Sequence, residues 1–176
     1  MANALSLLRL LLVGPFAWLV ARGDTGSASW AATLFCVAIA SDLADGPLAR
    51  ARGTASGVGR ALDHVADFGF VDAGLFAEAT RGALPWPLPV LVAAAFLQYV
   101  VDSYWLHRAG ELRMSGLGRW NGVLYFVPLG GALLADLGVT ALAEPTRWVA
   151  WALCASTLVS IADRALSLRR VASGPT

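Results

Sequence analysis

The chain has 176 residues, of which 57% are hydrophobic and 14% are charged, and its mean hydropathy is +0.64. A soluble domain of this length is rarely so apolar, so we expect an integral membrane protein. The formal net charge is +1 and the arginines form no long basic run, so the sequence gives no reason to expect a nucleic-acid partner.

Six apolar segments each approach the roughly 20 residues that a helix needs to cross the hydrocarbon core. They cover residues 5–20, 29–44, 62–79, 84–106, 122–142 and 148–167. We therefore predict an all-α integral membrane protein with six transmembrane helices. The connections are short, so residues 1–171 are expected to form one domain, followed by a disordered tail over residues 172–176.

The arginines predict the orientation, because the chain has no lysine. Six spans place both termini on one side of the membrane. That side also collects most of the loop arginines, namely Arg50, Arg52, Arg60, Arg108, Arg113, Arg119, Arg169 and Arg170. The opposite side has Arg22, Arg81 and Arg147. By the positive-inside rule, we expect both termini to lie on the cytoplasmic side of the membrane. We expect this membrane to be the inner membrane of the cell.

The first segment opens with three polar residues spaced three apart, Asn3, Ser6 and Arg9. This spacing places them on one face near the cytoplasmic end of a helix. Arg9 has two interpretations of similar weight: it extends to the interface as an isolated basic residue, or it belongs to a polar site.

The second and third segments carry the residues around which the chain is organised. Asp42 and Asp45 are three apart, and Asp63 and Asp67 are four apart, so each pair shares a helix face. An acidic side chain at mid-bilayer is disfavoured by roughly 2.5–3.5 kcal/mol. Bound cations are the expected compensation for such a cluster.

The charge and the chemistry of these four aspartates predict a two-metal site. Two divalent cations cancel four ionised carboxylates, and ligands that are all oxygen indicate Mg²⁺ or Mn²⁺. Two such ions about 3.5–4 Å apart are the usual clamp for displacement at phosphorus. The cluster therefore predicts phosphoryl transfer.

The spacing of this stretch resembles the signature of the CDP-alcohol phosphotransferase (CDP-alcohol phosphatidyltransferase) family. The matching residues are, in order, Asp42, Asp45, Gly46, Ala49, Arg50, Gly59, Asp63 and Asp67. Asn3, Ser6 and Arg9 are similar to the Asn-x-x-Thr-x-x-Arg opening common in that family. The resemblance implies transfer of a phosphatidyl group from CDP-diacylglycerol to an alcohol, with release of CMP.

The resemblance also implies a role for each matching residue. Asp42, Asp45, Asp63 and Asp67 would ligate the metal ions, and Asp67 would also be the general base. The residues expected to contact the nucleotide or its pyrophosphate are Gly46, Arg50 and Ser56, with Asn3, Ser6 and Arg9 on the nucleotide side. The family further implies a homodimer. Pro47, which follows the first aspartate pair, is interpreted as a kink.

Several polar residues lie outside the signature. Asp72 and Asp102 are expected to pair with an arginine or to line a wet cavity, and His64 is expected to have a supporting or surface role. Cys36 and Cys154 lie inside apolar runs, where packing is the simplest interpretation.

The acceptor is the least determined part of the prediction, because no subfamily pattern fits well. Arg108, Arg113 and Arg119 lie on the expected active-site face and are a candidate pocket for a phosphorylated acceptor, although topology alone also explains them. Glycerol 3-phosphate is expected first and inositol phosphate second, with serine or choline as alternatives. A divalent-cation transporter is the rival class, but it has no physical need for the glycine and arginine at fixed spacing.

Overall fold

The computed structural model describes residues 2–52, 57–106 and 116–172, with side chains over residues 6–41, 63–101 and 117–166. Within these residues the secondary structure is helical, as predicted. The elements are α1 (Ala2–Arg22), α2 (Thr25–Arg52), α3 (Gly57–Thr80), α4 (Pro87–Leu106), α5 (Gly116–Leu124), α6 (Phe126–Asp136), the 3₁₀ turn η1 (Thr140–Leu142) and α7 (Ala143–Ala172). Of the expected tail, Ala172 ends α7 and residues 173–176 lie outside the description.

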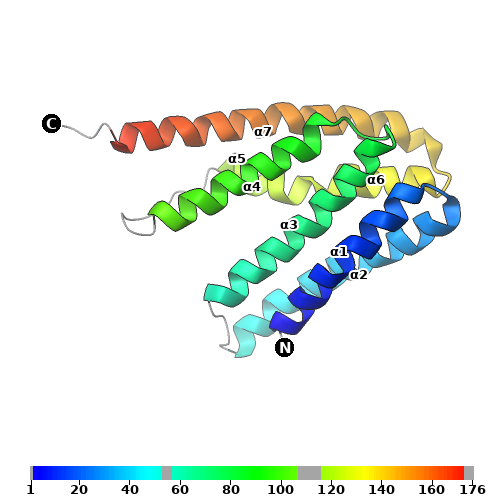
Figure 1. Ribbon diagram of the computed structural model, residues 1–176, viewed down its shortest axis with the longest axis horizontal. Helices are drawn as coiled ribbons and strands as arrows, with labels where there is room; N and C mark the ends of the chain where they lie inside the picture. The colour runs from blue at the N-terminus through cyan, green and yellow to red at the C-terminus, as the bar shows by residue number, and fades with distance from the viewer. Residues whose placement is uncertain (1, 53–56, 107–115, 173–176) are drawn as a thin grey trace.

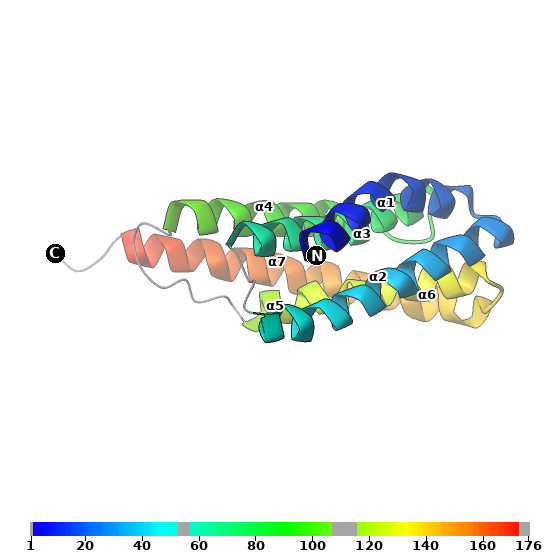
Figure 2. The same cartoon turned by 90° about the horizontal axis from the view of Figure 1, so that it is seen from below.

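The helices form two layers (Figures 1 and 2). One layer contains α1, α3 and α4, and the other contains α2, α5, α6 and α7. The connections α1–α2, α3–α4 and α6–α7 lie together at one end of the bundle, on the right in Figure 1. Helix α3 contacts α1, α4 and α6. It therefore holds the central position expected for the helix with the most acidic side chains.

The core forms where α3 packs on α1 and α6. Phe16 and Phe70 are fully buried, and their rings stack with centroids 4.1 Å apart. Gly74 lies one helical turn further along α3, where a Cβ would meet the Phe16 ring at 2.7 Å and Leu129 at 2.9 Å. A small residue is therefore required at this crossing, as is common where helices approach closely in membranes.

We predicted one continuous helix over the fifth segment, residues 122–142, and this prediction was wrong. The structure has two helices there, α5 and α6, joined at Tyr125, followed by the turn η1. Pro128 accounts for the break, because it has no N–H to donate to the carbonyl of Leu124. Gly138, with φ of 105°, then ends the segment before the predicted boundary.

Helix α2, in contrast, extends beyond its predicted end at residue 44. Helix α2 continues to Arg52, so Pro47 lies within its bounds. Within the described residues, a single helical stretch, Thr140–Leu166, is both long and apolar enough to cross a membrane, while Thr25–Ser41 and Pro87–Val101 are shorter apolar helices. Helices α2 and α4 continue past these two stretches, to Arg52 and Leu106, into residues whose side chains lie outside the description. Six spans with cytoplasmic termini therefore stay a prediction.

Arg81 joins three helices at the end of the bundle where α1 meets α2. Its guanidinium donates to both carboxylate oxygens of Asp136 at 2.5 and 2.8 Å, to Glu78 at 3.1 Å and to the carbonyl of Val20 at 3.1 Å. Gly23, with φ of +66°, packs directly against this guanidinium, where a Cβ would lie 2.5 Å from Arg81 Nε. We call these groups the Arg81 clamp.

Asp24 caps the start of α2 and should make stability depend on pH. Its carboxylate accepts hydrogen bonds from the backbone N–H and the hydroxyl of Ser27, and these bonds lower its pKa from 3.8 to about 2. A lowered pKa stabilises the fold above pH 3.8, and that stabilisation is lost as the pH falls toward 2.

We therefore expect Asp24→Asn to lower the Tm in mild detergent at pH 6, with the difference from the wild type closing between about pH 4 and pH 2. Glu144→Gln, in an exposed ion pair with Arg147, should give little difference at either pH. A constant gap for Asp24→Asn across this range would contradict the assignment.

Candidate active site

Helices α1 and α3 bring two groups of predicted site residues together. Ser6 Oγ donates to Asp63 Oδ1 at 3.1 Å. Arg9 forms an ion pair with Asp67, and its Nη1 lies 3.6 Å from Asp63 Oδ1. The Arg9 side chain is only 4% exposed, so it does not extend to the interface as an isolated basic residue. The structure favours its second interpretation, membership of a polar site.

Arg9 also links this site to α2. Its Nη2 donates to Ser41 Oγ at 2.9 Å and to the carbonyl of Ala38 at 3.4 Å. Ser41 directly precedes Asp42, so one guanidinium connects α3 to the part of α2 where the first aspartate pair begins. Arg9 therefore connects α1 to both α2 and α3, and spacing alone did not predict these contacts.

The remaining predicted residues are only partly described. Asn3 lies in α1, and Asp42, Asp45, Gly46 and Arg50 lie in α2, but their side chains are outside the described part. Ser56, Arg108 and Arg113 lie wholly outside it. Their roles stay predictions.

Asp63 and Asp67 suit a hard divalent cation. Both are carboxylates on one face of α3, and a metal ion bound to them would share them with the guanidinium of Arg9. Their oxygen atoms are the ligand type that Mg²⁺ and Mn²⁺ prefer. Among the described side chains no three acidic, histidine or cysteine residues group together, so a complete site requires further ligands such as the expected Asp42 and Asp45.

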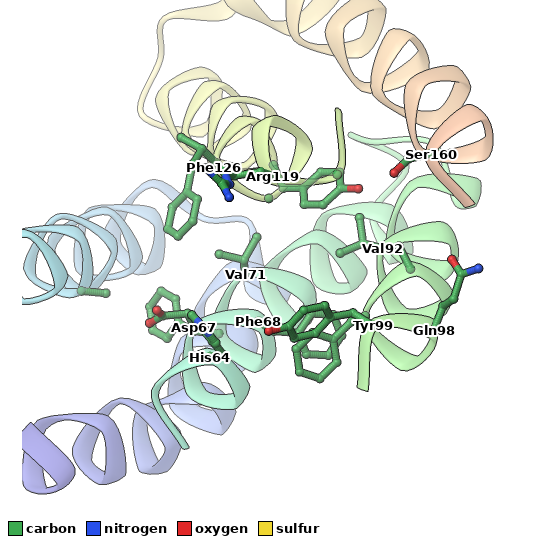
Figure 3. A pocket seen from close by; sticks show the side chains of 18 of the residues that line it. His64, Asp67, Phe68, Val71, Val92, Gln98, Tyr99, Arg119, Phe126 and Ser160 are labelled. Atoms are coloured by element: carbon green, nitrogen blue, oxygen red, sulfur yellow. The ribbon is translucent and has the colours of Figure 1, made fainter. Parts of the chain in front are cut away.

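A cavity of about 610 Å³ opens beside Asp67, between the two helical layers. Figure 3 shows Asp67 and His64 on one side of it, Arg119 and Phe126 on another, and Gln98 and Ser160 across from Asp67. Much of the wall is apolar, including Phe68, which stacks on Phe96 with ring centroids 3.9 Å apart. The cavity can therefore hold a ligand that has both apolar and charged parts.

The charged part of the cavity includes one arginine that the sequence analysis missed. Arg164 of α7 lines the cavity together with Arg119, and its guanidinium lies 5.7 Å from the centroid of the Tyr99 ring. A signal was present, because an arginine inside the apolar segment 148–167 is costly unless it faces a polar cavity. Tyr99, Gln98, Tyr125 and Ser160 gave no comparable signal, since isolated polar residues occur in many apolar segments.

His64 lies on the cavity wall rather than within a described metal cluster. Its ring meets that of Tyr99 edge-on, with centroids 6.5 Å apart. This position is compatible with the supporting role expected from its place between the aspartates.

Comparison with known proteins agrees with these features. The family model described as CDP-alcohol phosphatidyltransferase matches residues 1–159, which is most of the chain. The chain belongs to this family. The resemblance found in the aspartate signature is thereby confirmed, and the chain is a member of a phosphotransferase family.

Two curated bacterial proteins are similar to this chain. A cardiolipin synthase (CMP-forming) of Streptomyces coelicolor is 32% identical over 141 residues, which cover 76% of this chain and 65% of the relative. A probable phosphatidylglycerophosphate synthase of Mycobacterium tuberculosis is 32% identical over 135 residues, covering 74% of this chain and 64% of the relative. The matches thus span slightly less than two thirds of each relative's length.

Proposed function

We propose that the protein is a membrane-embedded transferase that moves a phosphatidyl group from CDP-diacylglycerol to a polyol acceptor and releases CMP. The observation that carries this proposal is that Asp67 lines a cavity that also presents Arg119 and Arg164. A carboxylate and two cations around one cavity are the groups needed to deprotonate a hydroxyl and to bind a phosphate.

Asp67 is the proposed general base. The acceptor hydroxyl loses its proton to Asp67 as its oxygen forms a bond to the phosphorus of the donor. The bond from that phosphorus to the leaving CMP then breaks, so the group is transferred without a redox change. This proton transfer requires the acceptor hydroxyl to lie within hydrogen-bond distance of an Asp67 carboxylate oxygen.

The proposed metal ligands are Asp42, Asp45, Asp63 and Asp67, which would hold two Mg²⁺ or Mn²⁺ ions. When bound, these ions would neutralise charge on the diphosphate. Gly46, Arg50 and Ser56 are proposed to contact the nucleotide and its pyrophosphate. Asn3, Ser6 and Arg9 would lie on the nucleotide side, where Ser6 and Arg9 orient Asp63 and Asp67.

Glycerol 3-phosphate is the proposed acceptor. Its phosphate dianion suits charge-assisted bonds from Arg119 and Arg164, with Arg108 and Arg113 as further candidates. The name phosphatidylglycerophosphate synthase, carried by one relative, describes a product that contains glycerol phosphate. A second candidate is phosphatidylglycerol, because the apolar wall of the cavity suits an acyl chain and another relative is named cardiolipin synthase. Inositol phosphate, serine and choline are weaker alternatives.

We also propose the membrane setting. The apolar composition and the stretch Thr140–Leu166 support an integral membrane protein. The proposed arrangement has six spans in the inner membrane, and the arginine distribution supports cytoplasmic termini and an active site that faces the cytoplasm. Water-soluble substrates would then reach the site from the cytoplasm. A homodimer is proposed from the family resemblance.

An acceptor panel with labelled CDP-diacylglycerol and Mg²⁺ tests this function. We expect CMP release with glycerol 3-phosphate or phosphatidylglycerol to exceed that with serine or choline. If glycerol 3-phosphate is preferred, Arg119→Ala should raise its KM by about tenfold or more, because a charge-assisted hydrogen bond is lost. Arg113→Ala tests one of the two further candidate arginines in the same assay.

Arg147→Ala is the matched control, because Arg147 is exposed and lies outside the cavity. Its KM should equal that of the wild type. Best use of serine or choline would contradict the phosphate pocket. Divalent-cation flux in liposomes without CMP release would instead support a transporter.

A further inference from the structure

Exposed tryptophan side chains gather near the end of the bundle where α1–α2, α3–α4 and α6–α7 connect, on the right in Figure 1. They come from α1, α2, the turn before α4, and α7, and each is between 50% and 72% exposed. We call these five residues the tryptophan belt: Trp18, Trp30, Trp86, Trp148 and Trp151. So much exposed aromatic surface at one end of a molecule indicates an interaction site.

The belt residues lie at similar levels in their helices. Trp18 precedes the end of α1 by four residues, and Trp30 and Trp148 follow the starts of α2 and α7 by five. At 1.5 Å per residue, these separations are about 6–7.5 Å. Trp86 directly precedes α4, and Trp151 lies three residues beyond Trp148. Both helical layers contribute, so the rings form a band at this end instead of a patch on one helix.

The belt is amphipathic, because each indole combines an apolar body with one N–H donor. Within the part of the chain that the structure describes, none of the five indole N–H groups donates a hydrogen bond to the protein. At the boundary of a bilayer, such a ring can lie against acyl chains while its N–H donates to water or to a lipid oxygen. The headgroup region therefore satisfies both parts of these side chains.

The arginines at this end already have carboxylate partners. Arg22 lies 3.1 Å from Asp24, Arg147 lies 3.7 Å from Glu144, and Arg81 belongs to the Arg81 clamp. An unpaired basic cluster would bind anionic lipids, but these paired charges give little such attraction. The indoles are thus the feature of this end that fits a lipid surface.

The belt is separate from the proposed active site. None of its five residues lines the cavity. On α1, Arg9 and Trp18 are nine residues apart, which is about 13.5 Å along the helix axis. The belt therefore concerns how the protein meets the bilayer and not how it binds its substrates.

We propose that the tryptophan belt holds this end of the bundle in the headgroup region of the leaflet that faces away from the cytoplasm. The inference rests on the proposed membrane setting. Tryptophan is enriched at both boundaries of a membrane, so the side follows from the arginines. Three arginines lie at the belt end, while eight lie in the segments expected on the opposite side.

Depth-resolved quenching of tryptophan fluorescence in lipid vesicles tests the belt. Five variants each keep one belt tryptophan and have phenylalanine at every other tryptophan position. Phosphatidylcholine brominated near the carboxyl ends of its acyl chains is the shallow quencher, and the same lipid brominated near the methyl ends is the deep quencher. For each variant, we expect the shallow quencher to reduce the emission by at least about twofold more than the deep quencher does.

Leu158→Trp, introduced into the chain with phenylalanine at all tryptophan positions, is the matched control. Leu158 is exposed on α7, ten residues beyond Trp148, so it lies about 15 Å further along the axis. This is half of a hydrocarbon core of about 30 Å, so the deep quencher should be the stronger one for this variant. If the multiple variants do not fold, the summed emission of the wild type should still show the preference for the shallow quencher.

Thiol labelling tests the side of the membrane. Thr140 is exposed in the turn η1, next to the start of α7. Thr140→Cys, in a chain with Cys36 and Cys154 replaced by alanine, should react with a membrane-impermeant maleimide in cells whose inner membrane is intact. The chain without cysteine is the control. Labelling that requires lysis would place this end in the cytoplasm and overturn the inference.

Two quenching results would also overturn the inference. Stronger quenching of the belt residues by the deep quencher would place them inside the hydrocarbon core. Quenching by neither lipid would show that protein, such as a second copy of this chain, covers the belt. These measurements need no turnover, so a wild type that releases no CMP with any acceptor would refute the proposed function while quenching and labelling still decide this inference.

Discussion

Asp67→Asn is expected to lower the turnover number by about a hundredfold to ten-thousandfold, which is the range that a positioned general base contributes. Asparagine has nearly the same shape but cannot accept the proton of the acceptor hydroxyl. Ser6, Arg9 and Asp63 are unchanged in this variant, so most of the polar site should persist. The measurement is release of labelled CMP, with CDP affinity measured by titration calorimetry in the presence of Mg²⁺.

Two comparisons make this result specific. Glu144→Gln, at an exposed carboxylate far along the chain from the cavity residues of α3, should keep wild-type turnover. Asp63→Ala should instead weaken the Mg²⁺-dependent affinity for CDP, because it removes a proposed metal ligand. Wild-type activity in Asp67→Asn would reject its role as the base, and undiminished affinity in Asp63→Ala would count against the two-metal site.

The largest effect on stability is expected from Arg81→Ala. This change leaves Asp136 and the fully buried Glu78 without their shared cation, and it removes the bond to the Val20 carbonyl. Removing one partner of a buried ion pair typically costs about 3–5 kcal/mol. The hydrogen bond to Asp136 also raises the pKa of Arg81, so the guanidinium stays charged throughout the usual pH range.

Thermal unfolding in mild detergent measures this effect. For a chain of this size, a loss of about 3 kcal/mol corresponds to a fall in Tm of roughly 6–12 °C. The Tm of Arg81→Lys should lie between those of the wild type and Arg81→Ala, because an ammonium keeps the charge but cannot form the paired bonds to Asp136. Arg147→Ala is the control, since its exposed pair with Glu144 should contribute at most about 1 kcal/mol. Equal Tm values for Arg81→Ala and Arg147→Ala would show that the Arg81 clamp does not stabilise the fold.

The candidate site could be predicted where fixed spacing encodes chemistry. Asp63 and Asp67 are four residues apart, so any α-helix places them on one face, and the structure does so. The family followed from the same spacing. Arg164 and Tyr125 were missed because each is a single polar residue in an apolar segment, far along the sequence from the residues that it accompanies on the cavity wall.

The predicted helix boundaries show a similar limit. Apolar runs in the sequence predicted the positions of most helices, because residues buried in lipid and residues buried in protein are both apolar. They did not reveal the break at Tyr125, because the residues on both sides of it are apolar and only Pro128 indicated that a backbone hydrogen bond is missing.

The sequence by itself determined the helical class, the apolar composition and the aspartate signature, because these depend on local periodicity and on fixed spacing along one chain. Only the tertiary structure decided that Arg9 connects α1 to α2 and α3, that Arg81 joins the ends of α1, α3 and α6, and that Arg164 lies on the wall of the same cavity as Asp67. Each of these features depends on side chains that are separated by many residues. Their contacts form only when the helices pack, and no local pattern in the sequence records which helix faces meet.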